Sequence, residues 1–157
     1  MKLLAEDIKE LQWEIQDSIC NLNKGGCMHF AYFFSKKLVE LTVEHSIYFV
    51  NNFPILVSYR DFNPPMHIMI FISNIGYIDG YSTYKSRGAV RVEYSTQFNY
   101  RHTKLSLKKM NCFRNARGWN WMYDTDQNIH LEKLIYKHTK SWQKKYTSET
   151  KKQLLLT

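Results

Sequence analysis

Cysteine is scarce in this sequence, and the cysteines that occur do not form pairs. Cys20, Cys27 and Cys112 are an odd number, and none of them belongs to a Cys-x-x-Cys unit. A disulfide framework and a structural zinc ribbon are therefore not expected. Unpaired thiols are typical of a reducing compartment, so we expect a cytoplasmic protein in which one cysteine is available as a nucleophile.

Long apolar segments are also missing. The run from Ile68 to Ile72 is only as long as a strand, and we expect no membrane span. Residues 1–10 carry acidic side chains and no small-residue cleavage site, so no signal peptide is expected. No repeat, low-complexity segment or long linker divides the chain. We therefore expect one domain that covers residues 1–157.

Negative charge is scarce in the second part of the chain. Through Arg60 the net charge is −1, whereas from Asp61 to Thr157 it is +9. Arg114, Arg117, Trp119 and Trp121 interleave cations with aromatic rings, as single-strand binders do. Five lysines follow on one side of the expected last helix: Lys133, Lys137, Lys140, Lys144 and Lys145. This half fits a nucleic acid, an anionic membrane surface or an acidic protein partner, or it serves as a solubilising face.

Helical and strand patterns are distributed unevenly along the chain. Apolar residues recur at three- and four-residue steps near both ends, whereas continuous or alternating apolar runs fill the middle. We expect helices over residues 3–22, 27–44 and 125–146, with frayed residues beyond 147. We expect strands over residues 45–50, 53–60, 66–72, 76–80 and 89–94, and a further strand within 94–110. The predicted fold class is α+β, with N-terminal helices packed on a mostly antiparallel sheet and a basic C-terminal helix.

One cysteine stands where a helix begins. Cys27 follows Gly25 and Gly26, and it opens a pattern in which Phe30 and Phe34 belong to one apolar stripe. A thiol at a helix N-terminus feels the positive end of the macrodipole, which favours the thiolate. The glycines allow backbone N–H groups to approach a substrate carbonyl. The alternative is a small buried side chain after a flexible cap.

A histidine and an aspartate follow in an expected hairpin. His67 lies inside the apolar run from Met66 to Ile72, and Asp79 lies on the partner strand. A loop of odd length, Ser73 to Ile75, puts both side chains on the same side of the sheet, whereas a two-residue loop would separate them. A nucleophilic cysteine needs such a base and a group that orients it. Alternatively, His67 is a buried histidine bonded to backbone, and Asp79-Gly80 is a turn.

The order of cysteine on a helix, then histidine and aspartate on strands, resembles the papain-like and transglutaminase-like cysteine fold. Two motifs carry the resemblance: Asn-x-x-x-Gly-Gly-Cys-x-x-Phe-Ala, which starts at Asn21, and Met-His-Ile-Met-Ile with Tyr-Ile-Asp-Gly, which start at Met66 and Tyr77. The chain is also similar to small phage-encoded proteins with a Gly-Gly-Cys helix and a His…Asp-Gly hairpin. The resemblance covers residues 21–81 and implies a papain-like core. A phage-encoded protein would lie in the host-cell cytoplasm.

The resemblance implies a role for each matching residue. Cys27 would be the nucleophile, His67 the base and later the acid, and Asp79 the orienting group. Asn21 stands where papain-like enzymes place an oxyanion-hole glutamine. Its side chain is shorter, and Asn23 is the alternative. Met28 replaces the tryptophan typical of papains, which departs from a close papain relationship.

Other partners for the cysteine remain open. His29 and His45 lie on or beside the same helix, and Asp61 competes with Asp79. His29 is two positions from Cys27 and therefore on another helix face. Cys20, Cys27, His29 and His67 are suitable zinc ligands by type, but their spacing is not compact, so no metal and no cofactor is expected.

Two functions follow from these patterns. The first is a cysteine-dependent amide hydrolase or acyl-transfer enzyme, a peptidase, isopeptidase or deamidase, that acts on a protein or peptide substrate through Cys27, His67, Asp79 and Asn21. The second is a non-catalytic binding protein, phage-encoded, whose basic half engages nucleic acid or a host protein.

Overall fold

The computed structural model describes residues 2–20, 22, 26–51, 66–94, 101–108 and 125–154. Two helices precede a run of four strands, and a helix, a fifth strand and a last helix follow; this largely segregated order confirms the predicted α+β class. The helices are α1 (Ala5–Ser18), α2 (Cys27–Glu40), α3 (Arg87–Tyr94) and α5 (Thr125–Leu154). The strands are β1 (Ser46–Asn51), β2 (Met66–Ile72), β3 (Gly76–Ile78), β4 (Thr83–Tyr84) and β5 (Arg101–Leu105).

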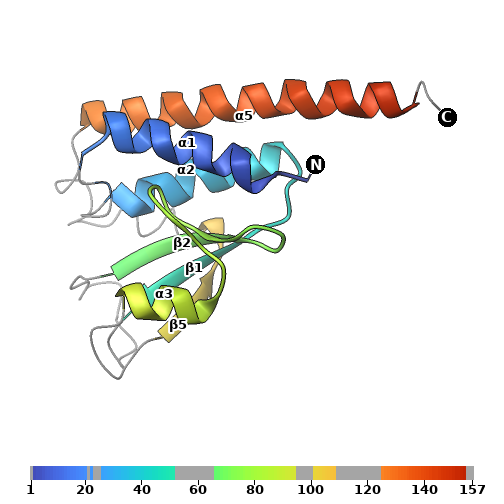
Figure 1. Cartoon of the computed structure of the whole chain (residues 1–157). Coiled ribbons are helices and arrows are strands. Elements are labelled where there is room, and N and C mark those ends of the chain that lie inside the picture. Colours follow the sequence, from blue (N-terminus) through green and yellow to red (C-terminus); the bar gives the residue numbers. More distant parts are fainter. Residues whose placement is uncertain are drawn as a thin grey trace.

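The strands form one sheet in the order β4-β3-β2-β1-β5. Every pair of neighbours is antiparallel, and the central β1–β2 pair runs from Ser46↔Phe71 to Asn51↔Met66. Helices α1, α2 and α5 form a layer on one side of this sheet, and α3 lies on the other side (Figure 1). The expected packing of N-terminal helices on an antiparallel sheet is therefore confirmed.

Alternation along β2 separates two cores. Ile68, Ile70 and Ile72 are buried in the main cluster with residues of α1, α2 and α5. Met69, between them, is buried in a second cluster that includes Val90 of α3. Successive strand residues point to opposite faces, which explains why a continuous apolar run suits a strand that is covered on both sides.

Helix α5 packs lengthwise against α1 and α2. Trp142 of α5 meets Phe34 of α2 edge to face, with ring centroids 6.2 Å apart. On the α1 side, Asp7 accepts hydrogen bonds from Lys145 Nζ (2.9 Å) and the Tyr146 hydroxyl, and it also accepts one from Leu4 N (2.9 Å) at the start of α1. These contacts place α5 along the layer, and its C-terminal part extends beyond the rest of the described chain (Figure 1).

Several sequence-based boundaries need correction. Residues 89–94, expected as a strand, belong to helix α3. Near the start of this helix, Ser86 Oγ accepts a hydrogen bond from Ala89 N. Val90 is buried whereas Val92 is 85% exposed, so the segment does not bury the alternate residues that a strand would bury. Helix α5 continues to Leu154, beyond the expected end at 146. Both N-terminal helices are shorter than expected. The expected strand 53–60 and Cys112 with the following aromatic stretch to residue 124 lie outside the described residues.

Candidate active site

Three segments that are far apart in the sequence meet at one end of the sheet. These are the first turn of α2, the start of β2, and the turn that follows β3 (Figure 1). The β2–β3 ladder spans only the pairs from Ile72↔Gly76 to Ile70↔Ile78. Beyond Ile70, towards the start of β2, β3 no longer pairs with that strand, and the side chains of Cys27, His67 and Asp79 converge there.

Cys27 is the first residue of α2, as the sequence predicts. The side chains of Phe30, Ala31 and Phe34 that follow it are fully buried, and Cys27 itself is 1% exposed. Cys20, in contrast, is exposed. The preceding residue, Gly26, is already in the right-handed helical conformation (φ −76°, ψ −14°), so α2 follows directly on a helical turn, and the dipole at this end of α2 favours negative charge.

His67 and Asp79 are joined by a buried hydrogen bond. His67 Nε2 donates to Asp79 Oδ2 over 2.9 Å, and the two side chains are 6% and 0% exposed. The strands are connected by Ser73 to Ile75, the odd-length loop that the sequence predicts. In this register His67 and Asp79 form a diagonal pair on the same side of the hairpin.

The imidazole also reaches the cysteine. His67 shares a side-chain hydrogen bond with Cys27. Burial alone lowers the pKa of His67, but the hydrogen bonds to Asp79 and Cys27 and the attraction of both groups outweigh burial and raise this pKa to about 9. Strict alternation puts His67 on the Met69 face of β2, away from α2. The bond to Cys27 therefore forms past the end of the β2–β3 ladder, at the edge of the helical layer.

The carboxylate of Asp79 is held on its other side by the backbone of its own turn. Asp79 Oδ1 accepts hydrogen bonds from Tyr81 N and Ser82 N, both at 2.7 Å, while Asp79 N donates to Ser82 O over 3.0 Å. One oxygen is thus used for the turn and the other for the imidazole. This division fixes the direction in which Asp79 faces His67.

Gln12 of α1 is a supporting residue that the sequence analysis missed. Its Nε2 donates to the backbone oxygen of Asp79 (2.9 Å), and its Oε1 accepts from Thr83 Oγ1 (3.2 Å). Gln12 is 4% exposed. The signal in the sequence is its position four residues after Ile8 and three before Ile15, where a glutamine interrupts the buried stripe of a helix.

Tyr81 connects the aspartate turn to the segment before the cysteine. Its hydroxyl donates to Ile19 O and accepts from Leu22 N, both at 2.8 Å. Gln16 Nε2 donates to the backbone oxygen of Tyr81 (2.7 Å). The residues on both sides of Cys20 and Asn21 are therefore tied to the same turn that orients Asp79.

Gly80 marks a close contact in this connection. A Cβ at position 80 would collide with the side chain of Leu22, which is fully buried. We expect Gly80→Ala to lower the free energy of unfolding by about 1–3 kcal/mol, because overpacking moves the buried neighbour. Urea denaturation followed by circular dichroism measures this loss.

Gly88 in α3 offers the matched control. Its Cβ would approach only Ser86 Oγ, at 3.5 Å, and the residue lies inside a helix. Gly88→Ala is therefore expected to stabilise the protein by roughly 0.5–1 kcal/mol. Equal effects of the two substitutions would contradict the contact between Gly80 and Leu22.

The remaining candidates fall into two groups. His45 is engaged elsewhere, since Nδ1 donates to Val43 O (2.9 Å) and Nε2 accepts from Ser35 Oγ (2.5 Å). His29 is buried within α2, near the ring of Phe33. Asn21, Asn23 and Asp61 lie outside the described residues, so their expected roles stay predictions.

Within the described ranges, no group of three or more His, Cys, Asp or Glu side chains is arranged to hold a metal ion. No helix in the same part of the chain is long and apolar enough to cross a membrane. Comparison of the chain with family models, curated proteins and solved structures finds no match. The case for a function therefore depends on the geometry of these residues.

Proposed function

We propose that the protein is a cysteine-dependent amide hydrolase or acyl-transfer enzyme with a papain-like core, and that Cys27, His67 and Asp79 are its catalytic triad. The observation that carries the proposal is that one buried imidazole is hydrogen-bonded to both a thiol and a carboxylate. A buried histidine with a purely structural role can bond to backbone groups, and it needs neither a thiol nor a carboxylate. A cysteine nucleophile needs both, one to exchange a proton with it and one to orient the base.

The hydrogen bonds assign the two nitrogens of His67. Because Nε2 donates to Asp79, Nδ1 is the nitrogen left for the sulfur of Cys27. With the pKa of His67 raised to about 9, the imidazole carries a proton at neutral pH. The protonated imidazole can donate a hydrogen bond to the sulfur of Cys27, and the dipole of α2 favours the negative charge that the sulfur carries when it acts as a nucleophile.

The reaction proceeds in two halves. The Cys27 sulfur attacks the carbonyl carbon of an amide, and the carbonyl oxygen takes the negative charge of the tetrahedral intermediate. The Cys27 backbone N–H is one proposed donor to this oxygen, and the sequence resemblance assigns the second donor to Asn21, with Asn23 as the alternative. The intermediate collapses to a thioester as His67 Nδ1 gives its proton to the leaving amine, or to ammonia if the substrate is a glutamine side chain.

The second half resolves the thioester. His67 removes a proton from water or from another amine, which attacks the thioester carbonyl and expels the thiolate. Water yields a carboxylic acid, and an amine yields a new amide. Peptidase, isopeptidase and deamidase activities all use this sequence. The buried His67–Asp79 pair supports this chemistry for all three activities and does not distinguish between their substrates.

Alkylation distinguishes an activated thiolate from a buried thiol. Access alone favours the exposed Cys20 over Cys27, which is 1% exposed. We expect iodoacetamide near pH 6 to modify Cys27 at least about ten times faster than Cys20, because only an activated thiolate forms at that pH. Peptide mass spectrometry of a short time course measures both rates in the same sample.

Histidine variants provide the control for this experiment. His138 of α5 also pairs with a carboxylate, that of Glu14 in α1 (2.6 Å), so this second pair lies between α1 and α5 and not beside Cys27. His67→Gln is expected to abolish the preference for Cys27, whereas His138→Gln retains it. Faster labelling of Cys20 than of Cys27 in the wild type would overturn the proposal. The substrate is sought by incubating wild type and Cys27→Ala with a cell lysate and comparing cleaved or deamidated peptides.

A further inference from the structure

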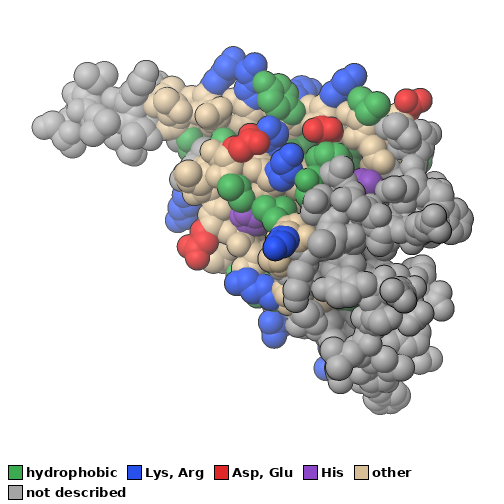
Figure 2. Space-filling model, turned by 180° about the vertical axis from the view of Figure 1, so that it is seen from behind, with side chains coloured by type: hydrophobic (Ala, Val, Ile, Leu, Met, Phe, Trp, Pro, Cys, Tyr) green, Lys and Arg blue, Asp and Glu red, His purple; other side chains and the backbone are tan. Residues whose placement is uncertain are grey.

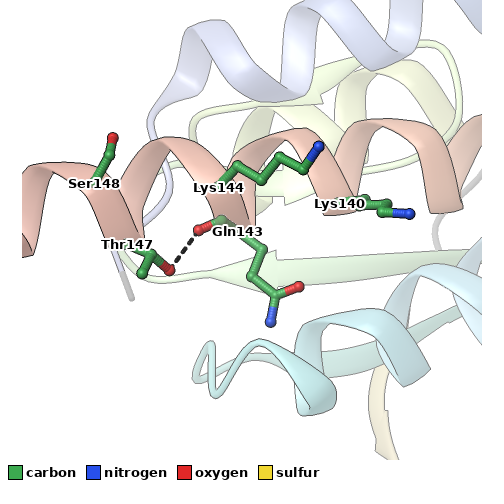
Figure 3. Close-up of a pocket in the computed structure, with 5 residues that line it drawn as sticks. All are labelled: Lys140, Gln143, Lys144, Thr147 and Ser148. Atoms are coloured by element: carbon green, nitrogen blue, oxygen red, sulfur yellow. Dashed lines mark hydrogen bonds between the residues drawn. The ribbon is translucent and has the colours of Figure 1, made fainter.

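A positively charged surface lies on the helical layer, where α2 and α5 adjoin. It is formed by Lys37, Tyr136, Lys140, Gln143 and Lys144, which we call the α2–α5 basic surface. Two hollows of about 130 and 440 Å³ adjoin here and share Lys140 and Gln143. In the larger one, the Gln143 side chain points towards the end of α2 (Figure 3).

The lysines of α5 differ in their partners. Lys137 and Lys145 face α1, where they pair with Glu14 and Asp7. Lys140 and Lys144 line the larger hollow, and no carboxylate of the described residues forms an ion pair with either. Figure 2 shows basic side chains projecting along α5, and all of the basic side chains of this helix other than histidine are lysines.

Few acidic groups offset this charge. Glu40 is the acidic residue that lines the smaller hollow, and it pairs with Lys37 over 2.7 Å. The surface therefore keeps a net positive charge, which attracts a polyanion.

An exposed aromatic ring lies within the surface. Tyr136 is 49% exposed, and Lys37 Nζ and Lys140 Nζ are 5.2 and 5.5 Å from its ring centroid. Ammonium groups beside an exposed tyrosine ring suit a ligand that combines phosphates with flat bases.

We propose that the α2–α5 basic surface binds single-stranded nucleic acid, with phosphates at Lys140 and Lys144 and a base stacked on Tyr136. An acidic peptide would use the lysines but would gain little from the ring. A base gains stacking from every exposed aromatic face, independent of sequence. The two ligands therefore differ in their dependence on Tyr136.

Fluorescence anisotropy with a labelled oligothymidine tests this binding on the full chain. Lys140→Glu/Lys144→Glu is expected to weaken binding at least about tenfold and to reduce the slope of log K against log salt by roughly 1.4, the contribution of two phosphate contacts. Tyr136→Ala is expected to weaken binding about fivefold or more at every salt concentration, since stacking is not screened.

Three controls make the outcome decisive. Lys9→Glu/Lys85→Glu changes the net charge equally at exposed lysines elsewhere and should leave most of the affinity. Thermal melting shows that each variant is folded. Cys27→Ala should bind like wild type, which separates this surface from the proposed enzyme site.

Other results would overturn the proposal. Equal weakening by the Lys9/Lys85 pair would mean that only net charge attracts the oligonucleotide. Polyglutamate that competes as well as the oligonucleotide, together with no effect of Tyr136→Ala, would indicate an acidic protein partner instead. An affinity too weak to measure at low salt would also count against it.

Discussion

Asp79→Asn is expected to slow alkylation of Cys27 at about pH 7.5 by up to roughly 30-fold, because loss of a nearby opposite charge lowers the pKa of His67 from about 9 by about 1–3 units and leaves less imidazolium beside the sulfur. Asp79 Oδ2 accepts the Nε2 proton of His67. Without that charge the pKa of His67 falls, and with it the fraction of thiolate. The alkylation rate of Cys27 at several pH values, measured by mass spectrometry, should show the largest difference from wild type between the lowered pKa of His67 and about 9.

The same substitution also changes which tautomer of the His67 imidazole is favoured. An asparagine amide nitrogen offers protons to Nε2, so a neutral imidazole would carry its own proton on Nδ1, the nitrogen assigned to the sulfur. His67 could then no longer accept a proton from Cys27 through Nδ1. Activity on any substrate should fall at least as far as alkylation does.

Glu14→Gln is the matched control for Asp79→Asn. Glu14 accepts a hydrogen bond from His138 Nε2 just as Asp79 does from His67, but on the seam between α1 and α5. Its removal should leave the alkylation of Cys27 unchanged within about twofold, since interactions at separate sites are nearly independent. An Asp79→Asn protein that alkylates at the wild-type rate would show that Asp79 does not support the ion pair.

The free energy of unfolding is expected to fall by roughly 3 kcal/mol as the pH rises from about 6.5 to about 9, through the titration of His67. A folded-state pKa above the ordinary 6.5 means that the folded protein holds this proton more tightly than the unfolded chain. The stabilisation is complete below pH 6.5 and is lost as the pH passes through the folded-state value. Urea denaturation at three pH values across this window measures it.

His67→Gln removes the titrating group and should flatten the pH dependence. The variant is expected to be less stable than wild type at low pH, where the buried imidazolium contributes most, and to approach it above about pH 9. His138→Gln should keep the slope of the wild type. A slope in His67→Gln equal to that of the wild type would assign the effect to other groups.

The parts of the site that follow short-range patterns were predictable from the sequence. The apolar stripe after Cys27 placed the cysteine at the start of α2, and the three-residue loop paired His67 with Asp79. Both conclusions need only the periods of a helix and a strand. They do not depend on how the helix lies across the sheet.

The meeting of Cys27 with His67 was not predictable from periodicity. Alternation assigns His67 to the face opposite α2, and the contact depends on where the β2–β3 ladder ends, at Ile70↔Ile78. The turn around Asp79 that follows this end is held by Gln12 and Gln16 of α1, which donate to the backbone oxygens of Asp79 and Tyr81 across 67 and 65 positions of the chain. No local pattern contains such long-range hydrogen bonds.

Helix α3 shows how a local pattern misleads. The alternation Ala89, Val90, Arg91, Val92 is typical of a strand with one buried side, yet Val90 is buried and Val92 is 85% exposed on a helix. A single apolar anchor suffices there because Val90 packs with Met69 and Tyr77 on the second face of the sheet. Tertiary packing decides between the two structures.

The attachment of the aspartate turn to α1 has a consequence for any attempt to dissect the molecule. Gln12, Gln16 and Ile19 all belong to the first twenty residues, and each bonds to Asp79 or Tyr81. A fragment that starts at Cys27 would contain every member of the proposed triad but would lack the residues of α1 and the segment after it that hold the turn around Asp79 in place. The smallest piece of this chain worth expressing as an independent enzyme must therefore begin before Gln12.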